Sequence, residues 1–158
     1  MPRQRVIPLV EPGRIVRTFT QDEASALADA WLDVFGQHRA GANTRDYLWH
    51  VFSGGRYPAL ELAAARDAYE QETCADYVVL SNDRDEAFVT DLRPTATPMH
   101  DWLVFPSNFA WTMAFTHEAD WLGPYFAKHP DYVRLQADEA SRMKKLQEIA
   151  RARERGWA

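Results

Sequence analysis

The five histidines and the acidic residues beside them are the side chains of this sequence that suit acid–base or metal chemistry. His117 is followed directly by Glu118, and metalloproteases use a His-Glu pair in the spacing His-Glu-x-x-His, which places two imidazoles on one helix face. Trp121 occupies the position of the second histidine here, so the motif is incomplete. We therefore predict no metal site.

A looser arrangement of the same residue types remains as an alternative hypothesis. A metal site or an acid–base or ligand site would form if the fold gathered His50, His100, His117 and Glu118, with Asp101 close by. For each histidine taken alone we expect a hydrogen-bonded structural role, because buried polar groups in proteins are nearly always paired. His50 in particular lies within an aromatic run that is typical of a core.

Complete motifs for a nucleophile or for nucleotide binding do not occur. Ser53 precedes two glycines but lacks the Gly-x-Ser-x-Gly pattern of a nucleophile elbow. Cys74 has acidic neighbours, which raise the pKa of a thiol and weaken it as a nucleophile. Neither a Walker loop nor Gly-x-Gly-x-x-Gly is present. We assign no catalytic residue and no cofactor, and we favour a protein that is not an enzyme.

The charge of the chain is concentrated in its middle. Residues 58–131 carry thirteen acidic and four basic side chains, whereas residues 132–158 carry a net charge of +3, within a total of −5. An acidic surface repels nucleic acid and attracts a cationic partner. We therefore predict a protein partner with a cationic surface and no nucleic-acid partner. The candidate partner-binding residues are Asp83, Asp85, Glu86, Glu118, Asp120 and Trp121.

Periodicity and turn residues predict the elements that position these side chains. The best-marked element is a helix over 20–35, which opens with a capping box of Thr20 and Glu23 and ends at Gly36. The aromatic run over 47–52 favours a buried strand, although its periodicity is also compatible with a helical turn. We expect further helices over 59–73 and 132–155, and strands over 14–19, 76–81, 86–92, 101–105 and, as the last strand, 110–116.

Together these elements predict an α+β fold. We expect one domain over 1–158, with a mostly antiparallel sheet of about four to six strands covered by helices, an extended arm over 1–13 and a long C-terminal helix. One face of the strand over 110–116, with Trp111, Met113 and Phe115, is expected to be core. The chain has no run of eighteen apolar residues and no signal-peptide pattern, so we expect no membrane association and a cytoplasmic location.

Three stretches, YLWHVFS (47–53), WTMAFTHE (111–118) and GPYF (123–126), resemble a small bacterial family of unknown function. The resemblance spans the middle two-thirds of the chain and leaves the C-terminal helix outside. That family has no assigned reaction, so the resemblance implies no catalytic residue. By type, small acidic aromatic-rich α+β proteins are similar to the immunity proteins of bacterial toxin systems.

The leading functional hypothesis is therefore a protein that binds and neutralises a bacterial toxin. The alternative is a small enzyme or ligand sensor that uses His117 and Glu118 with His50 or His100. A third hypothesis is a domain that only holds a larger assembly together.

Overall fold

The structure is a computed structural model that describes residues 10–118 and 121–156. Its helices are α1 (Gln21–Phe35), α2 (His50–Ser53), α3 (Leu62–Gln71) and α4 (Tyr132–Glu154). Its strands are β1 (Ile15–Thr18), β2 (Leu60–Glu61), β3 (Tyr77–Ser81), β4 (Ala87–Thr90), β5 (Trp102–Pro106), β6 (Trp111–Phe115) and β7 (Tyr125–Lys128). The described part of the predicted arm over 1–13 begins at residue 10.

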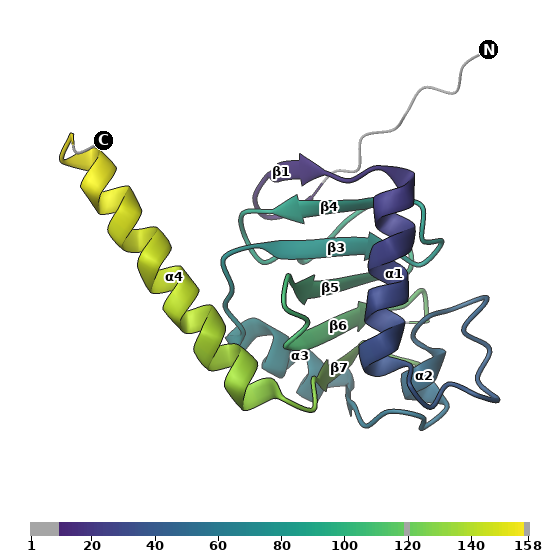
Figure 1. The fold of residues 1–158 in the computed structure, drawn as a ribbon. Coiled ribbons are helices and arrows are strands. Elements are labelled where there is room, and N and C mark those ends of the chain that lie inside the picture. Colours follow the sequence, from purple (N-terminus) through teal and green to yellow (C-terminus); the bar gives the residue numbers. More distant parts are fainter. Residues whose placement is uncertain (1–9, 119–120, 157–158) are drawn as a thin grey trace, which may run out of the picture.

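The seven strands form one sheet in the order β1-β4-β3-β5-β6-β7-β2, and all neighbouring strands are antiparallel (Figure 1). The predicted α+β class is confirmed, and the sheet has one strand more than the upper end of the expected range. None of the described helices combines the length and the apolar composition needed to cross a lipid bilayer.

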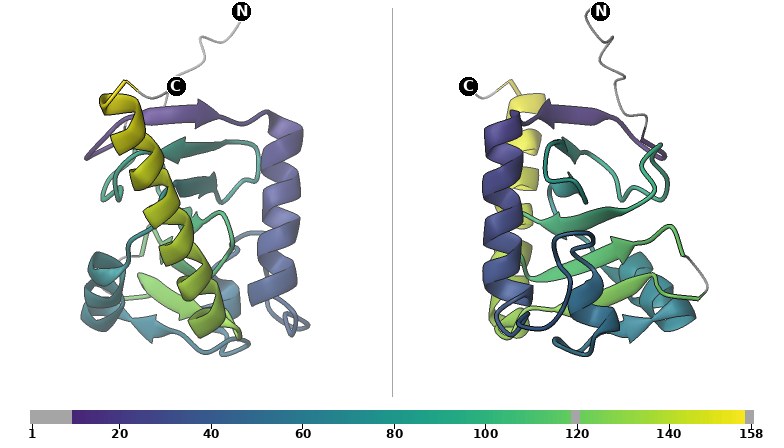
Figure 2. Two further views of the ribbon diagram at one scale, coloured as in Figure 1. Left: turned by 60° about the vertical axis from the view of Figure 1, so that its left-hand side comes forward. Right: turned by 90° about the vertical axis from the view of Figure 1, so that its right-hand side faces the viewer.

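Both faces of the sheet are covered, and each has its own core. The helices α1 and α2 pack on one face, while α3 and the first turns of α4 pack on the other (Figures 1 and 2). Along β3, Val78 and Leu80 belong to the first core, whereas Tyr77 and Val79 belong to the second. Alternate residues of a strand point to opposite faces, so a strand between two cores is apolar on both.

Because both faces of the sheet are covered, the strand β6 has a buried polar residue, Thr112. The face with Trp111 and Met113 is buried, as expected, but Thr112 and Ala114 on the other face are buried as well. The Trp31 indole Nε1–H from α1 donates to Thr112 Oγ1 at 3.0 Å. This bond satisfies two buried polar groups at once and fixes α1 to the centre of the sheet.

The helix α1 forms as the sequence predicts. Thr20 Oγ1 accepts from the Glu23 amide at 3.1 Å, and Glu23 Oε1 accepts from the Thr20 amide at 2.9 Å, which completes the capping box. A cap of this kind stabilises a helix by about 1 kcal/mol. The buried positions of α1 follow a helical stripe from Ala24 to Phe35.

The predicted strand over 47–52 is wrong, because this segment is a helical turn that includes α2. The Phe52 amide donates to Trp49 O at 2.9 Å, and the Gly54 amide donates to His50 O at 2.9 Å. Leu48, Trp49, Val51 and Phe52 are all buried. A six-residue apolar run of this kind is compatible with either periodicity, so burial alone did not identify the element.

The prediction that the strand over 110–116 is the last one is also wrong, because β7 follows it. Gly123 reverses the chain with φ +97°, and a Cβ there would lie 2.8 Å from Thr116 Cγ2, so this turn requires glycine. The short β2 then pairs with β7, so α3 begins at Leu62 instead of residue 59.

The long C-terminal helix is confirmed as α4. Tyr132 and Leu135 in its first half pack against the core, and its second half projects away from the sheet (Figure 1). Among the described residues, the last side-chain hydrogen bonds and ion pairs between α4 and the body are those of Arg142, which pairs with Asp76 at 2.7 Å and donates to Ser107 Oγ.

Candidate binding site at the strand ends

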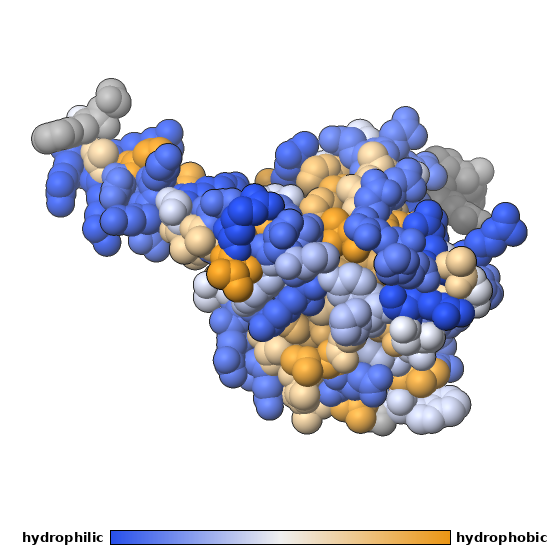
Figure 3. Space-filling model, turned by 60° about the horizontal axis from the view of Figure 1, so that its bottom comes forward, coloured by the Kyte–Doolittle hydropathy of each residue, from blue (hydrophilic) through white to orange (hydrophobic). Residues whose placement is uncertain are grey.

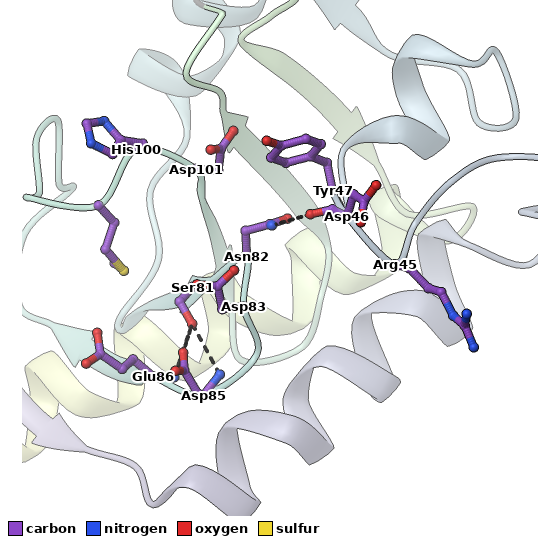
Figure 4. Close-up of a pocket in the computed structure, with 11 residues that line it drawn as sticks. Arg45, Asp46, Tyr47, Ser81, Asn82, Asp83, Asp85, Glu86, His100 and Asp101 are labelled. Carbon is purple, nitrogen blue, oxygen red and sulfur yellow. Dashed lines mark hydrogen bonds between the residues drawn. The ribbon is translucent and has the colours of Figure 1, made fainter.

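A hollow of about 700 Å³ lies where β3 ends and β5 begins, at the end of the sheet that faces the viewer in the right-hand view of Figure 2. We call it the acidic hollow. Figure 4 shows its lining, which comprises Arg45, Asp46, Tyr47, Ser81, Asn82, Asp83, Asp85, Glu86, Met99, His100 and Asp101. Five of these side chains are carboxylates and one is a guanidinium.

Hydrogen bonds between separate segments fix the shape of the acidic hollow. Asn82 Oδ1 accepts from the Leu48 amide at 2.9 Å, and Asn82 Nδ2 donates to Asp46 O at 2.7 Å (Figure 4). Arg84 Nη2 donates to Thr44 O at 2.6 Å. These bonds hold the loop before α2 against the β3–β4 turn, so the hollow exists before any ligand arrives.

The β3–β4 turn itself presents the acidic side chains. Ser81 Oγ accepts from the amides of Asp85 and Glu86 and donates to Asp85 Oδ1 at 3.0 Å. Within the described part of the chain, the exposed side chains of Asp83 and Glu86 make no hydrogen bond or ion pair. Their charge is therefore available to a partner.

Asp101 joins three segments at the wall of the acidic hollow. Its Oδ1 accepts from the Trp49 indole Nε1–H at 3.0 Å and from the His117 amide at 3.0 Å. His117 Nδ1 lies 2.9 Å from the same oxygen. The Asp101 side chain is only 11% exposed, so these donors satisfy a largely buried carboxylate.

The same contacts favour the protonated form of His117. The hydrogen bond that His117 Nδ1–H donates to Asp101 raises the pKa of His117 above its ordinary value of 6.5, and the negative charges of Asp101 and Glu118 act in the same direction. Glu118 Oε1 lies 3.6 Å from Nε2, the other ring nitrogen of His117. A protonated His117 is therefore stabilised between two carboxylates.

The aromatic rings behind Asp101 bring two of the predicted histidines near one another. The Tyr47 ring centroid lies 5.0 Å from that of His117 and 5.2 Å from that of His50, and Trp49 also contacts both. His50 Nδ1 hydrogen-bonds Asn43 O at 2.7 Å, so it has a hydrogen-bonded role as expected, but the residue is half-buried and lies outside the core. His100 lies apart from these rings, in the lining of the acidic hollow beside Asp101.

The two nucleophiles considered from the sequence do not complete a catalytic site here. Ser53 is the last residue of α2, and its hydroxyl faces His50 O. Cys74 is buried near the opposite end of the sheet, where burial, and then the charges of Glu139, Asp76 and Glu72, raise its pKa. The chemistry that the acidic hollow supports is the binding of a positively charged group near several carboxylates.

The predicted partner-binding residues fall into two groups. Asp83, Asp85 and Glu86 line the acidic hollow. Glu118 lies beside His117, and Trp121, on the same loop, is 76% exposed. Asp120 lies outside the described residues.

Asp46 is the carboxylate of the acidic hollow that sequence reasoning missed. It lies in the loop before α2, and no motif in the sequence connects that loop with the β3–β4 turn. Its acidic character was the one signal available. The hydrogen bonds of Asn82 and Arg84 bring the two loops together, and these depend on the fold.

The carboxylates of the acidic hollow are distributed around it. Among the described residues, no three His, Cys, Asp or Glu side chains are gathered so that they could hold a metal ion. Separated negative charges suit a ligand with several positive groups better than they suit a single ion.

Residues 18–126 match a family described as Domain of unknown function (DUF4275), and the chain belongs to this family because the match covers well over half of its length. All residues that line the acidic hollow fall within the match, while α4 lies beyond it. Neither the curated proteins nor the solved structures include a match to this chain.

Proposed function

We propose that this DUF4275 protein is a protein-binding module whose acidic hollow takes up a cationic segment of a partner protein in the cytoplasm. One observation carries the proposal: five carboxylates and one guanidinium line a hollow whose shape is fixed by hydrogen bonds between loops. Association with a cationic surface is accelerated by such a field, and a preformed site loses little conformational entropy on binding.

The loop after β6 adds an apolar anchor to this surface. Asp101 holds the beginning of that loop through the His117 amide, and Trp121 further along it is 76% exposed. Tryptophan is enriched among the residues that dominate binding energy at protein interfaces. The proposed interface therefore combines carboxylates in the hollow with an exposed indole beside it.

The partner that fits this chemistry best is a cognate bacterial toxin with a cationic active-site surface. Enzymes that act on nucleic acid carry such surfaces, because they must neutralise phosphate groups. A protein that occupies that surface with carboxylates blocks the substrate. This activity is that of an immunity protein, and it requires no catalytic residue in the present chain.

The test is affinity capture from the native organism with three purified baits. One bait is the wild type, the second carries Asp83→Lys and Glu86→Lys, and the control carries the same charge change as Asp29→Lys and Asp33→Lys on the exposed face of α1. A stoichiometric toxin-like protein held by the wild type and the control, but lost from the second bait, supports the proposal. Equal capture by all three baits contradicts it.

Asp101 and His117 favour a second candidate function, a small-ligand or acid–base site. Asp101 binds the Nδ1 side of the imidazole, which leaves Nε2 as the reactive nitrogen beside Glu118. A thermal-shift screen with small anionic and neutral compounds tests it, with His117→Ala as the matched variant. A compound that stabilises the wild type but not the variant would favour this function, and uniform shifts would contradict it.

A further inference from the structure

The second half of α4 is an unpacked helix. We call residues 143–155 the α4 arm. It extends from the body beyond Arg142 (Figure 1), and Leu146 and Ile149 on it are 45% and 50% exposed. In Figure 3 the arm projects from the body as a largely hydrophilic rod with a hydrophobic patch towards its far end.

The α4 arm is also cationic. Residues 143–155 contain five basic and two acidic side chains. A helix of this length without packed neighbours is marginal in water, so a surface that covers it would stabilise it. Pairing between two such arms would bring like charges together, which favours an anionic surface as the occupant.

The acidic hollow has the opposite charge and lies at the opposite end of the strands. α4 starts after β7, at the end where β3 begins, whereas the hollow lies where β3 ends. The α4 arm then points away from the body (Figures 1 and 2). It cannot reach the hollow of its own chain while the first half of α4 stays in place.

We propose that the α4 arm of one copy binds in the acidic hollow of a second copy. The inference rests on the proposed function, since it treats the hollow as a site for a cationic protein segment and names one such segment. Lys144, Lys145 and Arg151 supply the charge that complements Asp83 and Glu86. Tyr47 and Met99 in the hollow offer apolar surface to the exposed Leu146 and Ile149.

The proposed contact joins two different surfaces, so the symmetry of the contact determines which oligomers form. A head-to-tail contact extends into chains of copies unless its rotation closes a ring. Association should therefore rise with protein concentration and fall with salt, because the charges of both surfaces are exposed. A partner protein that occupies the acidic hollow should compete with this association between copies.

The test uses two full-length variants and measures molar mass in solution. The hollow variant carries Asp83→Lys and Glu86→Lys, and the arm variant carries the neutral changes Lys144→Gln, Lys145→Gln and Arg151→Gln, so that the two altered surfaces do not attract each other. We expect the mass of the wild type to increase with concentration at low salt, while each variant alone stays monomeric. An equal mixture of the two should form dimers and nothing larger, because it contains one working arm and one working hollow per pair.

Three results would overturn the inference: a wild type that is monomeric throughout, an arm variant that associates as the wild type does, or a hollow variant that still associates. The last of these would indicate pairing between arms. An arginine-rich peptide added to the monomeric arm variant separates the inference from the proposed function. If that peptide binds the arm variant but not the hollow variant while the wild type stays monomeric, only the inference fails. If it binds neither, both fail.

Discussion

Carboxylates lie at both ends of the sheet, but they are exposed at one end and buried at the other. At the end with the acidic hollow, Asp83 and Glu86 are exposed and unpaired among the described residues. At the other end, where α4 packs, Glu72 and Glu139 are only 6% and 4% exposed. We call this second region the α4 seam.

Every buried carboxylate of the α4 seam has partners. Tyr132 and Gln136 of α4 both donate to Glu72, and Glu139 Oε1 accepts from the Ala75 amide at 2.8 Å. Arg142 lies 3.6 Å from the same Glu139 oxygen. We infer that the paired, buried carboxylates fix the geometry of this fold. The exposed, unpaired carboxylates are available to bind a partner. Asp101 tests the rule, because it is buried and paired within the wall of the binding end.

Replacing Asp101 with alanine should produce the largest loss of stability among these carboxylates. The change leaves the Trp49 indole N–H and the His117 amide without their acceptor. The Trp49 indole belongs to a buried residue, and an unpaired buried donor costs about 1–3 kcal/mol, whereas the amide of the exposed His117 can turn to water. We therefore expect the free energy of unfolding in urea to fall by roughly 2–3 kcal/mol. Asp83→Ala is the matched control and should change it by less than about 0.5 kcal/mol. If both variants lose similar free energy of unfolding, paired and unpaired carboxylates do not differ in their contribution to stability.

Replacing Glu139 with alanine should have the next largest effect, confined to the α4 seam. The Ala75 amide and Arg142 both lose a partner, and we expect a loss of about 1–2 kcal/mol. Asp138→Ala is the control, because the neighbouring Asp138 is exposed and its one ion pair among the described residues is with Arg134. Hydrogen exchange gives the sharper measurement, since amides of α4 and Ala75 should lose protection while those of β3 to β6 should not. Equal loss throughout the sheet would show that α4 is part of one cooperative unit.

A third prediction concerns pH at the α4 seam. Burial raises the pKa of Glu72 above its ordinary value of 4.5, against hydrogen bonds from Tyr132 and Gln136 that lower it. The folded state then binds a proton more tightly than the unfolded state, so stability falls as pH rises from 4.5 through the raised pKa. Urea unfolding across this range should show that slope in the wild type. The slope should be smaller in Glu72→Gln, which keeps the shape of the side chain.

The sequence predicted local structure well wherever a local signal existed. The capping box of Thr20 and Glu23 specified the start of α1, and the strands expected over 76–81 and 86–92 are present as β3 and β4. The acidic turn was also identified as a candidate binding surface. These features depend on residues a few positions apart, which a pattern can capture.

Features that depend on distant residues were not predictable in this way. The helical turn at Trp49 is fixed by Asp101, which is 52 residues away, and the loop with Asp46 is fixed by Asn82, which is 36 residues away. The short β2 is a strand only because β7 lies beside it. Each case is a tertiary contact that overrides or replaces a weak local preference.

The smallest predicted effect is on the titration of His117 at the binding end. The hydrogen bond with Asp101 raises the pKa of His117 above 6.5, and Glu118 adds to the shift. A histidine with a raised folded-state pKa stabilises the protein fully below pH 6.5, and that contribution disappears as pH rises through the raised value. NMR titration of the five histidines should show His117 with the raised pKa in the wild type and a smaller shift in Glu118→Gln. Because His117 is partly exposed, solvent screens the effect on stability. If the pKa of His117 is not raised, its contact with Asp101 is not kept in solution. Asp101 would then behave like the unpaired carboxylates Asp83 and Glu86, and not like the paired carboxylates of the α4 seam.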